Sequence, residues 1–103
     1  MRTIERKMNA AIQDSKDWHL DNTEVNNVDG VSYVYLHGNL IAKVGDTWLE
    51  LFDGGYRSKT TKSRLNAILQ AHGNGERIFQ KDWSWYITLD GKTVAFKTGI
   101  LLD

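Results

Sequence analysis

Four cations and one tyrosine lie around the expected junction of a strand end and a helix start: Tyr56, Arg57, Lys59, Lys62 and Arg64. A helix start presents unpaired backbone N–H groups, so cations beside it can add to an anion site that suits phosphate. Gly54 and Gly55 do not have the spacing from the lysines that a P-loop requires. The segment predicts either a phosphate-binding site or a solvated helix start in which Asp53 pairs with one of the cations.

Aromatic side chains form a second group with possible chemistry. Trp83, Trp85 and Tyr86 fall on an expected strand, where aromatic rings with basic neighbours can stack unpaired bases. The neighbouring charges are mixed, since Asp82 and Asp90 accompany Lys81 and Lys92. We therefore expect Trp83 and Trp85 to pack in the core and Tyr86 to lie on the opposite, more exposed face.

No pattern indicates catalysis or a bound metal. The histidines, His19, His37 and His72, fall on three different expected elements, and the chain has no cysteine. Glu50 and Asp53 straddle a strand end, but an aspartate followed by glycine is common in turns. We predict no catalytic residues, no metal and no cofactor, although an active site assembled only by the fold stays an alternative.

The elements before this region follow from hydrophobic spacing. Residues 3–13 predict a short amphipathic helix capped near Thr3, and residues 14–27 predict a long connection with one short extended piece. Alternation over 31–36, 40–44 and 47–52 predicts a three-stranded antiparallel meander. Its turns are expected at Gly38-Asn39 and Gly45-Asp46.

The second half begins with a central helix. It is expected to start at Thr60 or Thr61, to bury Leu65, Ile68 and Leu69, and to end at 73–75 on a left-handed residue. A strand over 79–89 then turns at Asp90-Gly91 into 93–97, which gives a C-terminal β-hairpin. The apolar end at 100–102 predicts either a homodimer or burial of this tail against the sheet. We expect an α+β fold and a single domain over residues 1–103.

Composition narrows the class of protein. The 103 residues carry 13 Lys and Arg and 13 Asp and Glu, so no global field favours nucleic acid or a membrane. No apolar run is long enough to span a bilayer, and the first residues do not resemble a signal peptide. We expect a cytoplasmic protein.

Two stretches resemble small proteins encoded by tailed bacteriophages. They are Val34-Tyr35-Leu36-His37-Gly38-Asn39-Leu40-Ile41-Ala42 and the run from Leu51 to Ala67 that contains Phe52-Asp53-Gly54-Gly55-Tyr56-Arg57-Ser58 and Thr60-Thr61-Lys62-Ser63-Arg64-Leu65-Asn66. The similarity extends over about residues 31–102, including the stretch from Phe79 to Trp85 and the closing residues 98–102. The resemblance implies a phage context and the host cytoplasm, and it carries over no functional residue. Phage accessory proteins of this size commonly bind a host enzyme, block a defence system or bind nucleic acid.

Two functions follow as hypotheses. The first is a non-enzymatic phage accessory protein that binds a host or phage protein during infection, such as a host-takeover or anti-defence inhibitor. The neutral net charge favours it, because a dedicated duplex binder gains affinity from a strongly basic face. The alternative is a small nucleic-acid-binding protein that uses the basic segment 57–64.

Overall fold

The computed structural model describes residues 1–103 and has the α+β fold predicted from the sequence. Two helices, α1 (Thr3–Gln13) and α2 (Lys59–His72), combine with nine strands in two antiparallel sheets. The strands are β1 (Trp18–Leu20), β2 (Thr23–Val28), β3 (Val31–Leu36), β4 (Asn39–Val44), β5 (Leu49–Leu51), β6 (Arg77–Lys81), β7 (Ser84–Leu89), β8 (Lys92–Ala95) and β9 (Ile100–Leu102). The predicted meander is too simple, because β3, β4 and β5 form only the middle of a six-stranded sheet.

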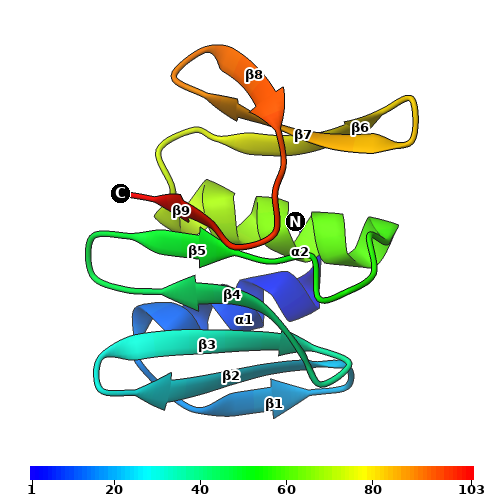
Figure 1. Ribbon diagram of the computed structural model, residues 1–103. Coiled ribbons are helices and arrows are strands. Elements are labelled where there is room, and N and C mark those ends of the chain that lie inside the picture. The colour runs from blue at the N-terminus through cyan, green and yellow to red at the C-terminus, as the bar shows by residue number, and fades with distance from the viewer.

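The large sheet has the strand order β1-β2-β3-β4-β5-β9, and every neighbouring pair is antiparallel (Figure 1). Its first two strands occupy residues 18–20 and 23–28, where a long connection with one short extended piece was predicted, so that prediction missed a strand pair. The cause is a weak alternation, since Val25 is the only aliphatic residue among the inward positions of β2. Pairing with β3 compensates for this weak local pattern.

A tight turn joins β3 to β4, one residue earlier than predicted. His37 and Gly38 form it with φ angles of 51° and 78°, as two-residue hairpin turns require, and Asn39 already begins β4. The register then shifts, because Val34 pairs with Ala42 while Tyr35 pairs with Leu40. This bulge keeps Val34 and Ala42 on the buried face despite the earlier turn.

Both helices lie against the same face of the large sheet, behind it in Figure 1. The core cluster contains 19 buried residues from both helices and both sheets. The predicted joint burial of Leu65, Ile68, Leu69 and Trp85 is confirmed. The predicted amphipathic helix over 3–13 is present as α1 and buries Met8, Ala11 and Ile12.

Helix α2 begins earlier than the predicted start at Thr60 or Thr61. Ser58 is its N-cap, because the Ser58 Oγ accepts a hydrogen bond of 3.1 Å from the backbone N–H of Thr61. The helix ends at Gly73 as predicted, but the φ of Gly73 is −93°, so the left-handed ending is wrong. Gly73 is required for space instead, since a Cβ there would lie 2.7 Å from the Leu69 carbonyl oxygen.

The small sheet has the order β6-β7-β8, where the sequence predicted one long strand over 79–89. Asp82 and Trp83 form a turn with φ angles of 51° and 69°, which divides the predicted strand in two. Trp83 is 93% exposed, so its predicted place in the core is wrong. An Asp-Trp pair carries no turn signal, because such turns favour Asn-Gly or Asp-Gly.

The side-chain amide of Asn66 on α2 binds the backbone of the small sheet. Asn66 Nδ2 donates a 2.8 Å hydrogen bond to the Ile78 carbonyl, and Asn66 Oδ1 accepts one of 2.8 Å from the Ile78 N–H. β6 therefore runs back alongside α2, and the turn at Asp82 and Trp83 points past the start of that helix (Figure 1).

The C-terminal residues complete the large sheet. Ile100 pairs with Leu51 and Leu102 pairs with Leu49, so β9 forms the edge beside β5. Burial of the tail against the sheet is thereby confirmed, while a homodimer stays a prediction. Neither helix is both long and apolar enough to span a membrane.

Candidate functional site

Arg64, one of the five predicted binding residues, is buried where α1, α2 and β2 meet. Its side chain is 4% exposed, and its Nη1 lies 2.9 Å from Glu5 Oε2. Its Nε also donates a hydrogen bond of 3.0 Å to the Thr23 hydroxyl. The structure thus corrects the prediction for Arg64, which holds the fold together and faces no solvent.

The carboxylate of Glu5 is held in its charged form. Burial alone would raise the pKa of Glu5. Hydrogen bonds from the Ser63 hydroxyl, the Arg2 backbone and Arg64, together with the charge of Arg64, outweigh burial and lower the pKa of Glu5 below its usual range. The pair is therefore an ionised contact between α1 and α2.

Arg57 is also occupied by contacts within the protein. Its Nε lies 3.2 Å from Asp53 Oδ2, as one alternative of the sequence analysis anticipated, and its Nη2 donates a 3.1 Å hydrogen bond to the Phe96 carbonyl. The guanidinium carbon lies 5.5 Å from the ring centroids of both Trp85 and Phe96. Arg57 thus fastens the loop before α2 to the end of the small sheet.

The side chains of the other three predicted residues form no hydrogen bond or ion pair within the protein. Tyr56 is 76% exposed, Lys59 is exposed and Lys62 is half-buried, and neither lysine forms an ion pair. Binding by these three side chains stays a prediction. The structure does not support a single site of all five, because Arg57 and Arg64 belong to different structural contacts.

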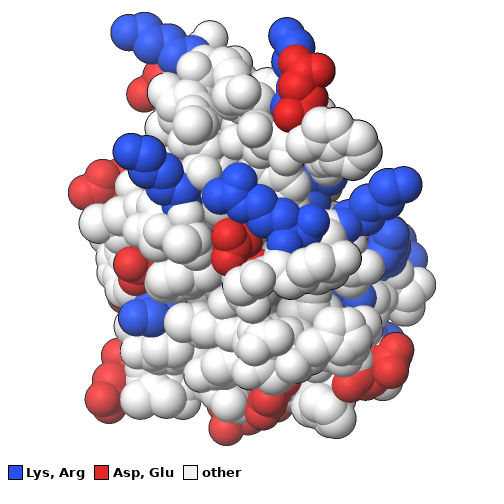
Figure 2. All heavy atoms as spheres, turned by 45° about the vertical axis from the view of Figure 1, so that its right-hand side comes forward, with Lys and Arg blue, Asp and Glu red and all other residues white.

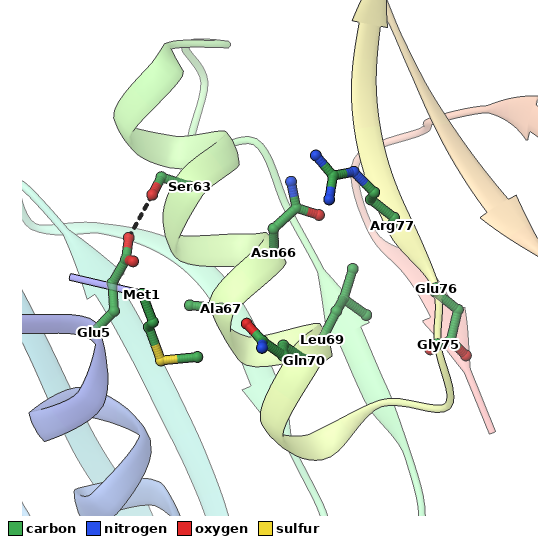
Figure 3. A pocket seen from close by; sticks show the side chains of 10 residues that line it. All are labelled: Met1, Glu5, Ser63, Asn66, Ala67, Leu69, Gln70, Gly75, Glu76 and Arg77. Atoms are coloured by element: carbon green, nitrogen blue, oxygen red, sulfur yellow. Dashed lines mark hydrogen bonds between the residues drawn. The ribbon is translucent and has the colours of Figure 1, made fainter.

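A groove of about 580 Å³ runs along α2 between the start of α1 and the start of β6 (Figure 3). Glu5 and Ser63 lie on one side of it, joined by a hydrogen bond of 2.6 Å, while Asn66 and Arg77 lie on the other. Glu5 already pairs with Arg64, and the Asn66 amide both donates a hydrogen bond to Ile78 and accepts one from it. The polar groups best placed to bind a ligand here already serve the fold.

The three histidines lie on three different elements, as predicted, although two of them share one hollow. His19 and His37 line one shallow hollow together with Asp21, Asn22 and Glu24. His72 lies apart on α2, its Nε2 has no hydrogen-bond partner, and burial lowers the pKa of His72. No group of three or more His, Asp or Glu side chains is placed to hold a metal ion.

The helices leave one face of the six-stranded sheet uncovered. We call it the outer sheet face. Two rows of paired residues cross it: Asn26, Tyr33, Lys43, Glu50 and Leu101 in one row, and His19, Glu24, Tyr35 and Leu40 in the other. None of these nine residues is buried, whereas their strand neighbours Val34, Leu36 and Val44 pack under the helices. All six strands therefore contribute residues to this face, and its tyrosine and leucine side chains come from β3, β4 and β9.

Lys43 lies at the centre of this face. Its ammonium group is 5.5 Å from the centroid of the Tyr33 ring and 5.8 Å from that of the Phe52 ring, and it lies 3.8 Å from Glu50 Oε1. The charge of Lys43 is thus balanced by its neighbours. Leu101, 56% exposed, extends the apolar part of the face toward the sheet edge.

Acidic residues lie along the margin of this face on the side of β1 to β3. Residues 14–50 contain seven Asp and Glu and only two lysines, whereas residues 57–97 contain eight Lys and Arg and three acids. In Figure 2 the cations gather across the middle and top of the molecule, and the lower part, where β1 to β3 lie, is mostly uncharged with acidic groups at its margin. The net charge is therefore zero because two regions of opposite charge balance each other.

Sequence reasoning did not identify the outer sheet face as a site. The alternation predicted over 31–36 puts Tyr33 and Tyr35 on the side opposite Val34 and Leu36, and the structure has this arrangement. The available signal was that large aromatic residues occupy the side of the strands that normally carries polar residues. It was inconclusive, because the sequence did not show whether a helix covers that side.

Neither the curated proteins nor the solved structures contain a match to this chain. One family of proteins, described as the Kyanoviridae Gp96 protein, has a sequence model that matches residues 1–103. This match confirms the resemblance to phage proteins noted from the sequence, and the chain is a member of this phage-encoded family.

Proposed function

We propose that this phage protein acts by binding another protein through its outer sheet face and does not catalyse a reaction. The observation that carries the proposal is the uncovered face itself, on which Tyr33, Tyr35 and Leu101 lie partly or largely exposed. Exposed apolar area that polar residues surround is typical of protein-interaction sites.

The charge of this region indicates the chemistry of the partner. Glu24 and Glu50 lie on the face, and the only cation there, Lys43, is paired. Phosphate groups would be repelled by the acidic surroundings, so a nucleic acid is a poor ligand for this face. A protein surface that combines apolar groups with Lys or Arg is complementary to it.

Such binding is compatible with a role in infection. A host enzyme or a defence protein with a cationic, partly apolar surface would be covered by the outer sheet face and thereby inhibited. A phage protein of the same surface chemistry is an equally suitable partner.

Capture of partners from a lysate of the phage's host, treated with nuclease, tests the proposal. Glu24→Lys and Leu101→Lys change two separate positions on the face, and each is expected to reduce capture of the partner at least tenfold, with the same melting temperature as the wild type. Asp14→Lys is the matched control, because it makes the same charge change as Glu24→Lys on the exposed end of α1.

Equal capture by all four proteins would place the interface elsewhere and defeat the proposal. Loss of capture on nuclease treatment alone would show that nucleic acid bridges the partner, which also contradicts it.

A further inference from the structure

We propose that the outer face of the small sheet binds single-stranded nucleic acid, with unpaired bases stacking on Trp83, Phe79 and Tyr86 and phosphates contacting Lys81 and Arg77. This surface lies on a different sheet from the outer sheet face, so the inference does not depend on the protein-binding proposal.

Trp83 is the first observation. A bulky residue with a φ of 69° is an outlier, since this conformation brings its Cβ close to the following carbonyl oxygen. The side chain is also 93% exposed, so its apolar surface is hardly buried and contributes almost nothing to the stability of the fold. Both features are unfavourable for the free protein, and an unfavourable conformation kept at a surface points to a ligand contact.

An aromatic pair on the same sheet is the second observation. Phe79 on β6 pairs across the sheet with Tyr86 on β7, and their rings stack with centroids 5.8 Å apart. Both side chains are half-buried and lie on the face opposite Ile78, Trp85 and Ile87, which pack in the core. In Figure 1 no other element covers this face. Phe79 and Tyr86 thus form a flat apolar platform. Two residues separate each of them from the turn at Asp82 and Trp83.

The charges around the platform are the third observation. The cations between residues 77 and 97 are Arg77, Lys81, Lys92 and Lys97, and all four are exposed without an ion-pair partner. Lys81 lies on the same side of β6 as Phe79, and Arg77 leans over the strand edge toward Asn66 (Figure 3). The only acids between 77 and 97 are Asp82 and Asp90, both in turns.

These features together favour a single strand as the ligand. Bases stack on protein aromatics only when they are unpaired, and the usual single-strand platform combines stacked rings with adjacent cations. Duplex binding needs a broader basic surface than two cations provide. An acidic peptide would form ion pairs with the cations, but its carboxylates would not stack on the three exposed or half-buried rings.

Fluorescence anisotropy with a labelled ten-nucleotide mixed-sequence DNA or RNA strand tests the inference. Because two phosphate contacts contribute about 0.7 each, log affinity should fall with log salt with a slope of about −1.4. Stacking on Trp83 should also quench tryptophan fluorescence as the oligonucleotide is added.

Trp83→Gly removes the aromatic ring while keeping the fold stable, so it tests binding independently of folding. It creates an Asp-Gly turn, the preferred sequence for this conformation, so the variant should be at least as stable as the wild type. Its affinity for the oligonucleotide should be about 5- to 150-fold lower, the effect of losing one stacked base. Arg77→Gln with Lys81→Gln should weaken binding and bring the slope close to zero.

Lys59→Gln with Lys62→Gln is the matched control, because it removes two cations outside the small sheet. It should leave the affinity within about twofold. The inference is overturned if the wild type does not bind at 50 mM salt, if Trp83→Gly binds as tightly as the wild type, or if only the control variant loses binding. It is equally overturned if Trp83→Gly loses binding to anionic vesicles or to polyglutamate while oligonucleotide binding is unchanged.

Discussion

Two of the arginines near the start of α2 stabilise the fold by different physical routes. Arg57 stays partly exposed and combines an ion pair with contacts to two aromatic rings. Arg64 is buried and depends on one carboxylate, Glu5, with Thr23 and Asn22 as further hydrogen-bond partners. Loss of a partner therefore matters far more for Arg64, because a buried charge has no water to replace it.

Substitution of Glu5 tests this difference. Glu5→Gln leaves the Arg64 charge buried without a counter-ion, and we expect the free energy of unfolding to fall by about 3 to 5 kcal/mol. Asp53→Asn removes the carboxylate beside Arg57, and it should cost about 1 kcal/mol or less because that pair is partly exposed. Urea denaturation measures both. Similar losses for the two variants would contradict the assignment of Glu5 and Arg64 as the central ion pair.

The lowered pKa values of Glu5 and His72 predict how stability depends on pH. Each group binds protons more readily when the chain is unfolded, so acid favours the unfolded state. Stability should fall first as the pH drops below about 6.5, where unfolded histidine becomes charged, and again below about 4.3, where unfolded glutamate is protonated.

Denaturation midpoints measured from pH 8 to pH 3 test this dependence. His72→Gln should flatten the upper part of the profile, and Glu5→Gln should flatten the lower part. A profile that neither substitution changes would show that other groups cause the acid dependence.

At the scale of elements, β9 shows that a three-residue strand can have two different faces. Leu102 and Ile100 lean into the core beside β5, whereas Leu101 points to the outer sheet face. Leu102→Ser should lower the free energy of unfolding by roughly 1 to 2 kcal/mol. The substitution removes partly buried apolar surface and places a polar hydroxyl in its position.

Leu101→Ser is the control for this prediction, since it makes the same chemical change one residue earlier. Its effect on stability should stay within about 0.5 kcal/mol. Thermal or urea unfolding distinguishes the two variants. The reverse order of effects would mean that β9 is rotated by one residue relative to β5.

At the scale of the whole molecule, charge is separated although the total is zero. The first strands carry the acidic excess, and the region from α2 to the small sheet carries most of the cations. Each region keeps its own field because the Debye length at physiological salt, about 8 Å, is shorter than the molecule. This separation is the physical basis for two binding surfaces with different partners.

Ion-exchange chromatography tests the separation. Near the isoelectric point of about 6.8, a protein with evenly mixed charges should pass through both resin types. This protein should be retained by both an anion and a cation exchanger at low salt, and released as salt screens the two regions. Glu24→Lys should weaken retention on the anion exchanger more than Asp14→Lys does. Passage through both resins would contradict the charge separation.

The sequence determined the elements whose own side chains repeat with a clear period. α1, β3, β4 and α2 each carry three or more apolar residues at the spacing of their element, and β5 lies within a predicted strand that does. Their predicted limits differ from the structure by only a few residues. β1 and β2 lack such a pattern, and the turn at Asp82 and Trp83 lacks a turn sequence, so both were missed.

Tertiary structure alone decided which residues are free to bind. Arg64 looked like one of four solvated cations until Glu5, 59 positions away, was placed beside it, and Leu101 became a surface residue only when β9 paired with β5. Exposure of Trp83 and of the outer sheet face depends in the same way on which elements cover which faces. Local periodicity reports the two sides of an element, and only long-range packing determines what lies against each side.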